Sequence, residues 1–371
     1  MSLRSYALRA LLVVVVLVTA ACGSLGTERE KEWERRVASA LEPYECPTVA
    51  ASDYPSGYYT GPLIDTHLHV PHLSDDFGGP DDDTDKPRGK DSDQYDSIAT
   101  EDRPLLGETV TIGKIACTLE QEGTMQAFTF FPVFPDNPGP LVEVAYKTQQ
   151  AHGSLFVPFI QASASEVSTV EADVLEEMLA LRPGLFTGFG EVGDSPTEPI
   201  NPAPDEPIYI NDFQVAENHG LLVYFHPGIG HAANLQRAIQ QFPDVTFIVH
   251  GDFVRPDIGD LMANNPNIYF TANDIFDQAS ALFRFGAKQT WVDAMEQNWD
   301  AMLDQAIETY EDLINQYPDR FMWGTDRADI VWDYDADIGL LLAKFGRAFI
   351  GRLDPAVQEK FAYLNAQALL Q

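Results

Sequence analysis

The chain has 371 residues, of which 45% are hydrophobic and 22% are charged, so it contains enough apolar material for a large packed core. Its 57 acidic and 23 basic residues give a formal net charge of −34, and a surface this negative repels phosphate backbones and anionic lipid headgroups. These values exclude low-complexity, collagen-like and coiled-coil proteins, and they argue against nucleic acid as a partner.

The N-terminus has the pattern of an export signal. Arg4 and Arg9 precede an apolar run, Ala10–Ala21, which is shorter than the roughly 20 residues that a membrane-spanning helix needs. The run ends in the letters VTAAC, which resemble a bacterial lipoprotein signal. We therefore expect a signal peptide over residues 1–21, a lipid on Cys22 as the sole link to a membrane, and an extracytoplasmic mature protein, periplasmic or on the cell surface. A plain cleaved signal and an uncleaved anchor are the alternatives.

Residues 22–61 are expected to form a tether and lead-in. Thr27–Arg36 is highly charged and predicts a short solvated helix, and several prolines and glycines follow it. Cys46 and Cys117 could form one disulfide outside the cytoplasm. The alternative is a pair of unbonded, buried thiols.

Eight short apolar runs recur beyond residue 61, and each begins or ends near Gly, Pro or Asp. Apolar residues occupy both odd-numbered and even-numbered positions of each run, which is typical of parallel strands buried on both faces. The runs are Leu63–Val70, Met125–Phe131, Phe156–Ala162, Phe186–Val192, Leu221–His226, Thr246–Gly251, Asn267–Ala272 and Arg320–Thr325.

Segments of helical length separate these runs. Val170–Leu181, Ala232–Phe242 and Trp291–Tyr317 have apolar residues at spacings of three and four, and Asp354-Pro355 marks the start of the last helix. Eight strands alternating with helices predict a (β/α)8 barrel over residues 62–371, with an open doubly wound sheet as the alternative.

A long acidic insertion follows the first predicted strand, from Pro71 to about Glu108. Asp75–Asp102 contains 11 acidic residues against three basic ones, a local charge of −8. We expect an exposed loop over the mouth of the barrel.

Polar residues end five of the eight apolar runs. The carboxyl ends of the strands form the face on which barrel enzymes build their sites. His67 and His69 are alternate residues of the first run, so both are expected to point into the mouth. Glu191, His226, His250 and Asp326 end the fourth, fifth, sixth and eighth runs. Buried carboxylates and imidazoles cost several kcal/mol unless they are paired or bound to a metal, so the pattern predicts a metal site.

Taken in this order, these residues resemble the amidohydrolase superfamily, and most closely its amidohydrolase 2 branch, over roughly residues 62–350. The resemblance implies a distorted (β/α)8 barrel with one or two divalent ions. By the same resemblance, His67, His69 and Asp326 would hold one metal and His226 would be a further ligand. His250 would be either a ligand or the catalytic histidine.

Glu191 matches the position of a bridging carboxylate in some relatives, and whether it bridges two ions is left open. Relatives with a carbamylated lysine are excluded because no lysine ends a strand. Zinc, the expected metal, accepts histidine nitrogen and carboxylate oxygen and lowers the pKa of a bound water to about 7. Asp326 can accept a proton from this water, and His250 can help to polarise the scissile carbonyl. The expected reaction is hydrolysis of an amide, ester or lactone of a small molecule.

Two arginines and one glycine pattern complete the candidate residues. Arg255 and Arg327 follow the sixth and eighth runs, where each could bind a substrate carboxylate or form a salt bridge within the protein. Gly188-x-Gly190-x-x-Gly193 matches a dinucleotide fingerprint by letter, but the residues after it do not begin a helix, so a nicotinamide cofactor is rejected.

Two other functions remain open. One is a metal-dependent, non-oxidative decarboxylase of an aromatic or unsaturated carboxylic acid. The other is a lipoprotein that binds a metal or ligand without turnover. The sequence predicts neither the substrate nor the oligomeric state.

Overall fold

The computed structural model describes residues 28, 30–47, 54–73, 104–162, 169–193, 202–251, 253–276, 287–328 and 330–371. The predicted signal peptide, Cys22, most of the acidic insertion and residues 194–201 lie outside this part of the chain. Within it, no helix has both the length and the apolar character needed to cross a membrane.

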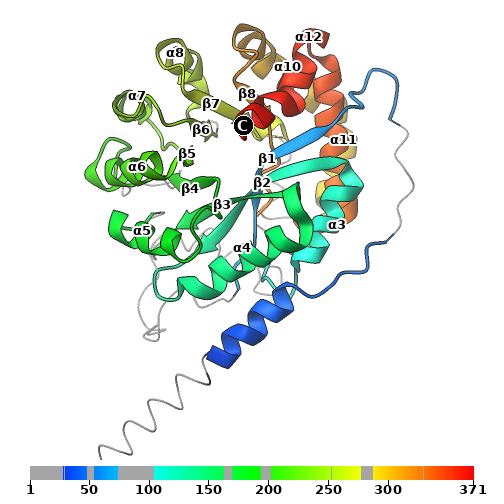
Figure 1. The fold of residues 1–371 in the computed structure, drawn as a ribbon. Helices are drawn as coiled ribbons and strands as arrows, with labels where there is room; N and C mark the ends of the chain where they lie inside the picture. Colours follow the sequence, from blue (N-terminus) through cyan, green and yellow to red (C-terminus); the bar gives the residue numbers. More distant parts are fainter. Residues whose placement is uncertain are drawn as a thin grey trace, which may run out of the picture.

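Eight parallel strands stand side by side in sequence order, with helices around them, which confirms the predicted (β/α)8 barrel (Figure 1). The strands are β1 (Leu63–His69), β2 (Thr124–Val133), β3 (Phe156–Ala162), β4 (Gly188–Gly193), β5 (Leu222–His226), β6 (Phe247–His250), β7 (Ile268–Ala272) and β8 (Phe321–Trp323). Just beyond β8, a parallel bridge between Leu68 and Arg327 joins the first and last strands.

The main helices around the strands are α3 (Ile112–Glu122), α4 (Pro138–His152), α5 (Ala172–Ala180), α6 (Pro207–His219), α7 (Ala232–Gln241), α8 (Ile258–Asn264), α10 (Lys288–Gln316) and α11 (Ala336–Arg352). Apolar side chains between strands and helices form the larger part of the core. The predicted start of the last helix is confirmed at α12 (Pro355–Glu359), because the Asp354 carboxylate accepts a hydrogen bond from the amide of Ala356 at 2.8 Å.

A second core fills the inside of the barrel. It includes Ile64, Phe128, Phe159 and Tyr224. Ala366, from the segment near the C-terminus, also belongs to it. The C-terminus lies at the centre of the ring in Figure 1. The Asn365 amide donates to the carbonyls of Pro318 and Phe321 at the start of β8, so the C-terminal segment closes the amino end of the barrel. The carboxyl ends of the strands lie at the opposite end of the barrel.

The two chain segments that flank the acidic insertion lie next to each other. The Leu106 amide donates to the carbonyl of His72 at 2.7 Å, and His72 and Leu105 form a parallel bridge. The described residues on both sides of the insertion are therefore joined just beyond the carboxyl end of β1.

The N-terminal helix extends to residue 40, beyond the predicted segment Thr27–Arg36, and its last turn is buried. Val37 is 6% and Ala40 is 0% exposed, and the Ser39 hydroxyl donates to the Gly107 carbonyl. The charged first turns face solvent, whereas the last turn packs against the chain that re-enters the barrel.

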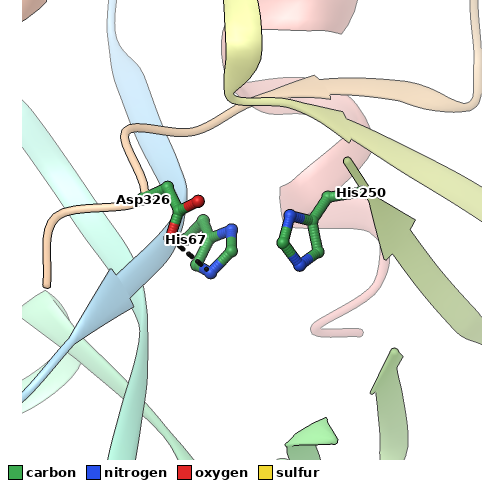
Figure 2. A group of neighbouring side chains, drawn as sticks. All are labelled: His67, His250 and Asp326. Carbon is green, nitrogen blue, oxygen red and sulfur yellow. Dashed lines mark ion pairs between the residues drawn. The ribbon is translucent and has the colours of Figure 1, made fainter. Parts of the chain in front are cut away.

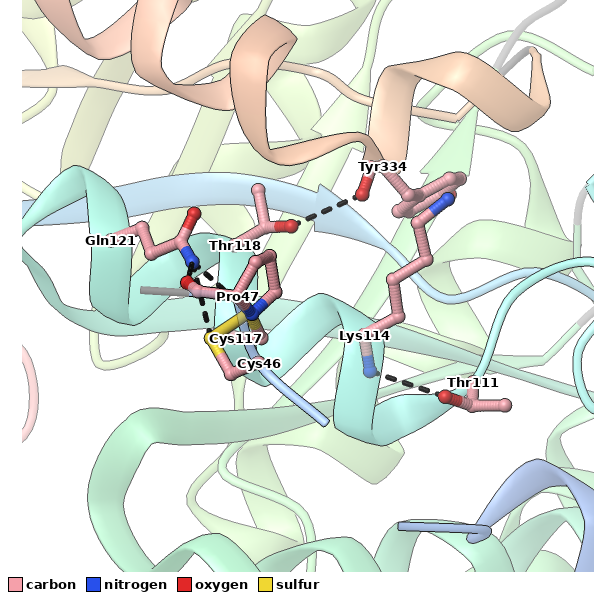
Figure 3. Close-up of a disulfide and its surroundings, with 8 residues drawn as sticks. All are labelled: Cys46, Pro47, Thr111, Lys114, Cys117, Thr118, Gln121 and Tyr334. Carbon is pink, nitrogen blue, oxygen red and sulfur yellow. Dashed lines mark hydrogen bonds between the residues drawn. A yellow bond between two sulfur atoms is a disulfide. The ribbon is translucent and has the colours of Figure 1, made fainter. Parts of the chain in front are cut away.

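Cys46 and Cys117 form a disulfide, so the bonded alternative of the prediction is the one that the structure adopts (Figure 3). The Gln121 amide donates to the Cys46 sulfur at 3.2 Å and to the carbonyl of Pro47. The bond attaches the lead-in segment to helix α3.

Asp212 of α6 is a fully buried acid, and it generates a prediction about stability. Its carboxylate accepts one hydrogen bond from Thr169, while its Oδ1 atom has no partner among the described residues. Burial raises the pKa of Asp212 to about 7, and nearby Glu171 adds to the effect. The folded protein therefore holds a proton that the unfolded chain releases near pH 4, so stability falls as the pH rises from about 4 to 7.

Asp212→Asn removes this penalty. We expect the variant to be more stable than the parent at pH 8, by roughly 2–4 kcal/mol, and the gain to disappear towards pH 4. Urea denaturation at both pH values measures the difference. Replacing the exposed Asp244 by Asn is the control and should change stability at neither pH. An equal gain at pH 4 and pH 8 would contradict the assignment.

Candidate metal centre

The structure brings together the six residues that end five of the predicted strands. Their side chains meet at the carboxyl end of the barrel, and their exposure rises from 0% for His67 to 26% for Asp326. The six residues are His67, His69, Glu191, His226, His250 and Asp326. Figure 2 shows three of them, from β1, β6 and the segment after β8, directed towards a common space.

Four donor atoms from separate side chains form the tightest part of this cluster. The Nε2 atoms of His67 and His69 lie 3.0 Å apart. Oδ1 of Asp326 is 3.1 Å from the first and 3.6 Å from the second. Oε2 of Glu191 lies 3.4 Å and 3.1 Å from the same two nitrogens.

The other oxygen of Glu191 faces a second pair of imidazoles. Its Oε1 atom lies 3.1 Å from Nδ1 of His226 and is in direct contact with Nε2 of His250. The rings of His226 and His250 have centroids 4.3 Å apart. Glu191 therefore stands between two groups of donors, one on each oxygen.

These distances fit a divalent cation. Ligands about 2.0–2.2 Å from a tetrahedral zinc ion are about 3.3–3.6 Å from one another, and the five distances above run from 3.0 to 3.6 Å. Two imidazole nitrogens 3.0 Å apart repel each other unless a proton or a cation lies between them. Nitrogen and carboxylate oxygen are also the donors that zinc and similar ions accept.

The electrostatics of the metal-free cluster indicate the same need for positive charge. Burial disfavours the cation of His69, but Asp326 and Glu191 outweigh burial and raise the pKa of His69 to about 10. Burial lowers the pKa of His250 to about 4. Burial alone would raise the pKa values of Glu191 and Asp326, but the surrounding histidines hold both below their usual range. Without metal, a proton on His69 therefore offsets one of the two carboxylate charges, whereas a divalent cation would offset both.

A bulge in β1 orients the two histidines of this strand. Asp65 pairs with Ala127 and Leu68 with Thr129, so β1 contains one residue more than β2 over this stretch. The His67 ring packs against Phe130 inside the barrel, with centroids 5.2 Å apart. Asp65 points the other way, into the layer between strands and helices. Simple alternation would have placed Asp65 on the same side as His67.

The glycines of β4 explain how Glu191 reaches the mouth. Gly190 has a φ of 122° and Gly193 a φ of 142°, and a Cβ atom on either would lie 2.2 Å from a backbone oxygen of β5. Only glycine allows β4 to approach β5 so closely. The pairing of the two strands is irregular between Phe189 and Val192, and Glu191 turns inward at this irregularity. The glycine pattern therefore serves strand packing.

The prediction that Arg327 binds substrate is wrong, and the salt-bridge alternative is correct. The side chain is 1% exposed and lies behind the site, not in its mouth. Its guanidinium donates to both carboxylate oxygens of Glu122, at 2.6 and 2.9 Å, and to Asp65 at 3.3 Å. Burial opposes the charge of Arg327, but these two carboxylates raise its pKa.

Asp65 is a site residue that the sequence analysis missed. Its Oδ1 atom accepts hydrogen bonds from the backbone amides of His67 and Thr325, both at 3.0 Å. The Thr325 hydroxyl donates to the other oxygen at 2.6 Å. One carboxylate thus ties β1 to the segment after β8 beside the metal-binding cluster. The sequence feature that could have identified Asp65 is its position as an acidic residue within a buried strand.

Arg255 lies beside the mouth, in the segment that follows β6. Its guanidinium contacts the carboxylate of Asp274, which also accepts a hydrogen bond from Tyr310. These three residues line a small pocket against α10. Substrate binding by Arg255 stays a prediction.

Asn273 is a second residue that the sequence analysis missed. It follows β7, a strand for which no polar end residue was identified, and its amide donates to Oδ2 of Asp326 at 2.8 Å.

Comparison with known proteins gives one family. Residues 64–371 match the family model described as Amidohydrolase. No curated protein matches the chain.

Several solved structures are similar to the chain at low sequence identity. An amidohydrolase from Burkholderia multivorans has 13% identity and a TM-score of 0.49, with 84% of this chain and 99% of that one covered. A dihydroxybenzoic acid decarboxylase from a Polaromonas species, with manganese and an inhibitor bound, has 11% identity and a TM-score of 0.47 over 84% and 96% of the chains. A 4-oxalomesaconate hydratase from Rhodopseudomonas palustris has 13% identity and a TM-score of 0.42 over 83% and 95%.

Arg327→Met tests the buried ion cluster. The substitution leaves Asp65 and Glu122 buried without their cation, so we expect the free energy of unfolding to fall by about 3–5 kcal/mol. Urea denaturation followed by circular dichroism and by tryptophan fluorescence measures the loss. Arg237, which is 56% exposed and pairs with Asp205, is the matched control, and its replacement by Met should cost under about 1 kcal/mol. Equal losses in the two variants would contradict this account.

Proposed function

The chain belongs to the amidohydrolase family, and on this premise we propose that it is an extracytoplasmic, metal-dependent hydrolase of a small molecule. The bond cleaved would be an amide, ester or lactone, and the attacking group a metal-activated water. Family membership and the cluster of imidazoles and carboxylates together support a metal-dependent enzyme. The reaction, the metal and the cellular location are the parts that we propose.

One observation carries the proposal. Two imidazole nitrogens and two carboxylate oxygens converge at the end of the barrel where such enzymes act, with the nitrogens 3.0 Å apart and each oxygen 3.1 to 3.6 Å from them. His67 is fully buried and Asp326 is the most exposed of the four residues. The donors therefore lie at the floor and wall of a site that opens to solvent.

The six residues could supply two overlapping ligand groups, because His250 also lies close to His67 and Asp326. We propose that His67, His69 and Asp326 hold one ion together with Oε2 of Glu191. Oε1 of Glu191, with His226 and His250, would offer a position for a second ion. Zinc is proposed because it accepts this mixture of nitrogen and oxygen donors. When bound, it supplies a Lewis acid and a water that is acidic enough to ionise near neutral pH.

Asp326 is the proposed general base. Its carboxylate is ionised at neutral pH, because His67 and His69 lower its pKa, and it is the cluster's most exposed side chain. It can accept a proton from the attacking water and return it to the leaving group. His250, by contrast, directs Nε2 at Glu191. This contact favours the ligand role over the role of polarising the substrate carbonyl.

The backbone of Asp326 is also unusual. Its φ is 53°, in the left-handed region that costs a residue with a side chain about 1–2 kcal/mol. A hydrogen bond of 2.9 Å from its amide to the carbonyl of His67 holds it there. Strained residues of this kind are concentrated at functional sites.

The location outside the cytoplasm is supported by two features. The N-terminal pattern resembles a lipoprotein signal with Cys22 as the acceptor of the lipid. The Cys46–Cys117 disulfide suits an oxidising compartment. We propose a protein anchored to a bacterial membrane only through this lipid, with a small-molecule substrate and no nucleic-acid partner.

A metal analysis of the purified protein, combined with a panel of esters, lactones and amides, tests the proposal. Hydrolysis of a panel member by zinc-loaded protein would support it. Carbon dioxide release from aromatic or unsaturated acids would favour the decarboxylase instead. Tight zinc binding without turnover of any class would indicate a binding lipoprotein.

Two substitutions separate the proposed roles. His67→Ala removes a fully buried ligand, so we expect both the bound metal and the activity to be lost. Asp326→Asn removes the base, so we expect kcat to fall by about 10²–10⁴-fold with a much smaller change in KM. His219, which pairs with Glu176 at the end of α6, is the control, and His219→Ala should keep metal and rate. Full metal content and rate in His67→Ala would show that the ligand assignment is wrong.

A further inference from the structure

Asn273 makes one side-chain contact with the candidate metal centre. Its Nδ2 donates to Oδ2 of Asp326 at 2.8 Å, whereas Oδ1 of Asp326 faces the two histidines of β1. The two oxygens of Asp326 thus have different partners. A carboxylate whose second oxygen is occupied by an amide donor presents one oxygen, not two, to a cation.

The other end of the Asn273 amide is not satisfied. Its Oδ1 is buried and has no hydrogen-bond partner among the residues that the structure describes. Leaving a buried acceptor unpaired costs about 1–3 kcal/mol, so such a group calls for a reason other than stability. With the amide reversed, its oxygen would face the carboxylate of Asp326, so Asn273 can donate to Asp326 only in the observed orientation.

The backbone that carries Asn273 is anchored on both sides. Ala272, before it, ends β7 and pairs with Trp323 of β8. Asp274, after it, is held by Arg255 from the segment beyond β6 and by Tyr310 from α10. The position of the Asn273 amide is therefore fixed by elements outside the metal-binding cluster.

We propose that Asn273 is a positioning residue that fixes which oxygen of Asp326 faces the metal. The inference rests on the proposed function, because it assumes that Asp326 binds a cation. The cost of its unpaired Oδ1 offsets what its hydrogen bond to Asp326 contributes to stability. It keeps Oδ1 of Asp326 directed at His67 and His69 and holds Oδ2 away from the cation as a hydrogen-bond acceptor.

Asn273→Leu tests the proposal, because leucine has a similar size but neither the donor nor the unpaired acceptor. Outer hydrogen-bond partners of metal ligands typically contribute 10–100-fold to metal affinity. We expect the Kd for Zn²⁺ alone, measured by competition with a chelator, to rise by about that factor. The visible spectrum of the Co²⁺-loaded protein should change, because it reports the number and geometry of ligands. The thermal midpoint of the metal-free protein should stay equal or increase.

Asn267→Ala is the matched control, at the opposite end of the same strand. The Asn267 amide donates only to the backbone carbonyls of Phe242 and Val245, so its loss should lower the thermal midpoint and leave the Zn²⁺ affinity unchanged. Asn273→Ala provides a second variant in case leucine prevents folding.

The outcomes distinguish the two levels of the proposal. If the parent protein binds no Zn²⁺, the proposed metal centre is wrong. If the parent binds Zn²⁺ and both Asn273 variants keep its affinity and the Co²⁺ spectrum, the inference about Asn273 is overturned and the metal centre stands. A lower thermal midpoint in the Asn273 variants, with unchanged Zn²⁺ affinity, would show that the residue is only structural.

Discussion

The Asp65 carboxylate joins the first and last strands of the barrel beside the metal-binding cluster. It accepts hydrogen bonds from the backbone amides of His67 and Thr325, and Arg327, which also pairs with Glu122, donates to it from behind. Together with the backbone hydrogen bonds from Asp326 to His67 and from His69 to Arg327, this contact fixes the spacing of the residues that β1 and the segment after β8 present to the mouth. The cluster in front therefore depends on a second, fully buried set of charges that faces the helices. Because His67 also packs on the aromatic side chains of Phe130 and Tyr224, the donors lie in a poorly hydrated environment, where unpaired charge is costly.

The architecture could be predicted from the sequence because parallel strands buried on both faces leave a strong signal. All eight apolar runs became strands in the predicted order, and the alternating helices followed. The predicted ends were less accurate. β8 has three residues, not six, and beyond it the chain joins β1 through the isolated bridge between Leu68 and Arg327. The packing of Ala40 against the barrel was missed, since the charged start of the N-terminal helix dominated its pattern.

The six residues of the cluster were found because each follows an apolar run, and position in the barrel then brings them together. The bulge in β1 could not be predicted, because a strand buried on both faces has no hydrophobic alternation that an extra residue would interrupt. Alternation alone places Asp65 on the same side as His67, so its role was overlooked. Arg327 was assigned to substrate because its place in the chain suggested the mouth. Its direction depends on Glu122, a residue of another element more than 200 positions away. Asn273 was missed for a similar reason, because an amide after a strand has meaning only when its partner is known.

The disulfide has a consequence for the continuity of the molecule. Cys46 and Cys117 lie on either side of both β1 and the acidic insertion, and they are separated by 71 positions in the sequence. If a protease cut the chain within the insertion, His67 and His69 would lie on one polypeptide fragment and the remaining donors on the other. The two fragments would nevertheless stay linked through sulfur. A break at any peptide bond between β1 and α3 would thus leave the first strand covalently attached to the rest of the barrel, as long as the cystine stays oxidised.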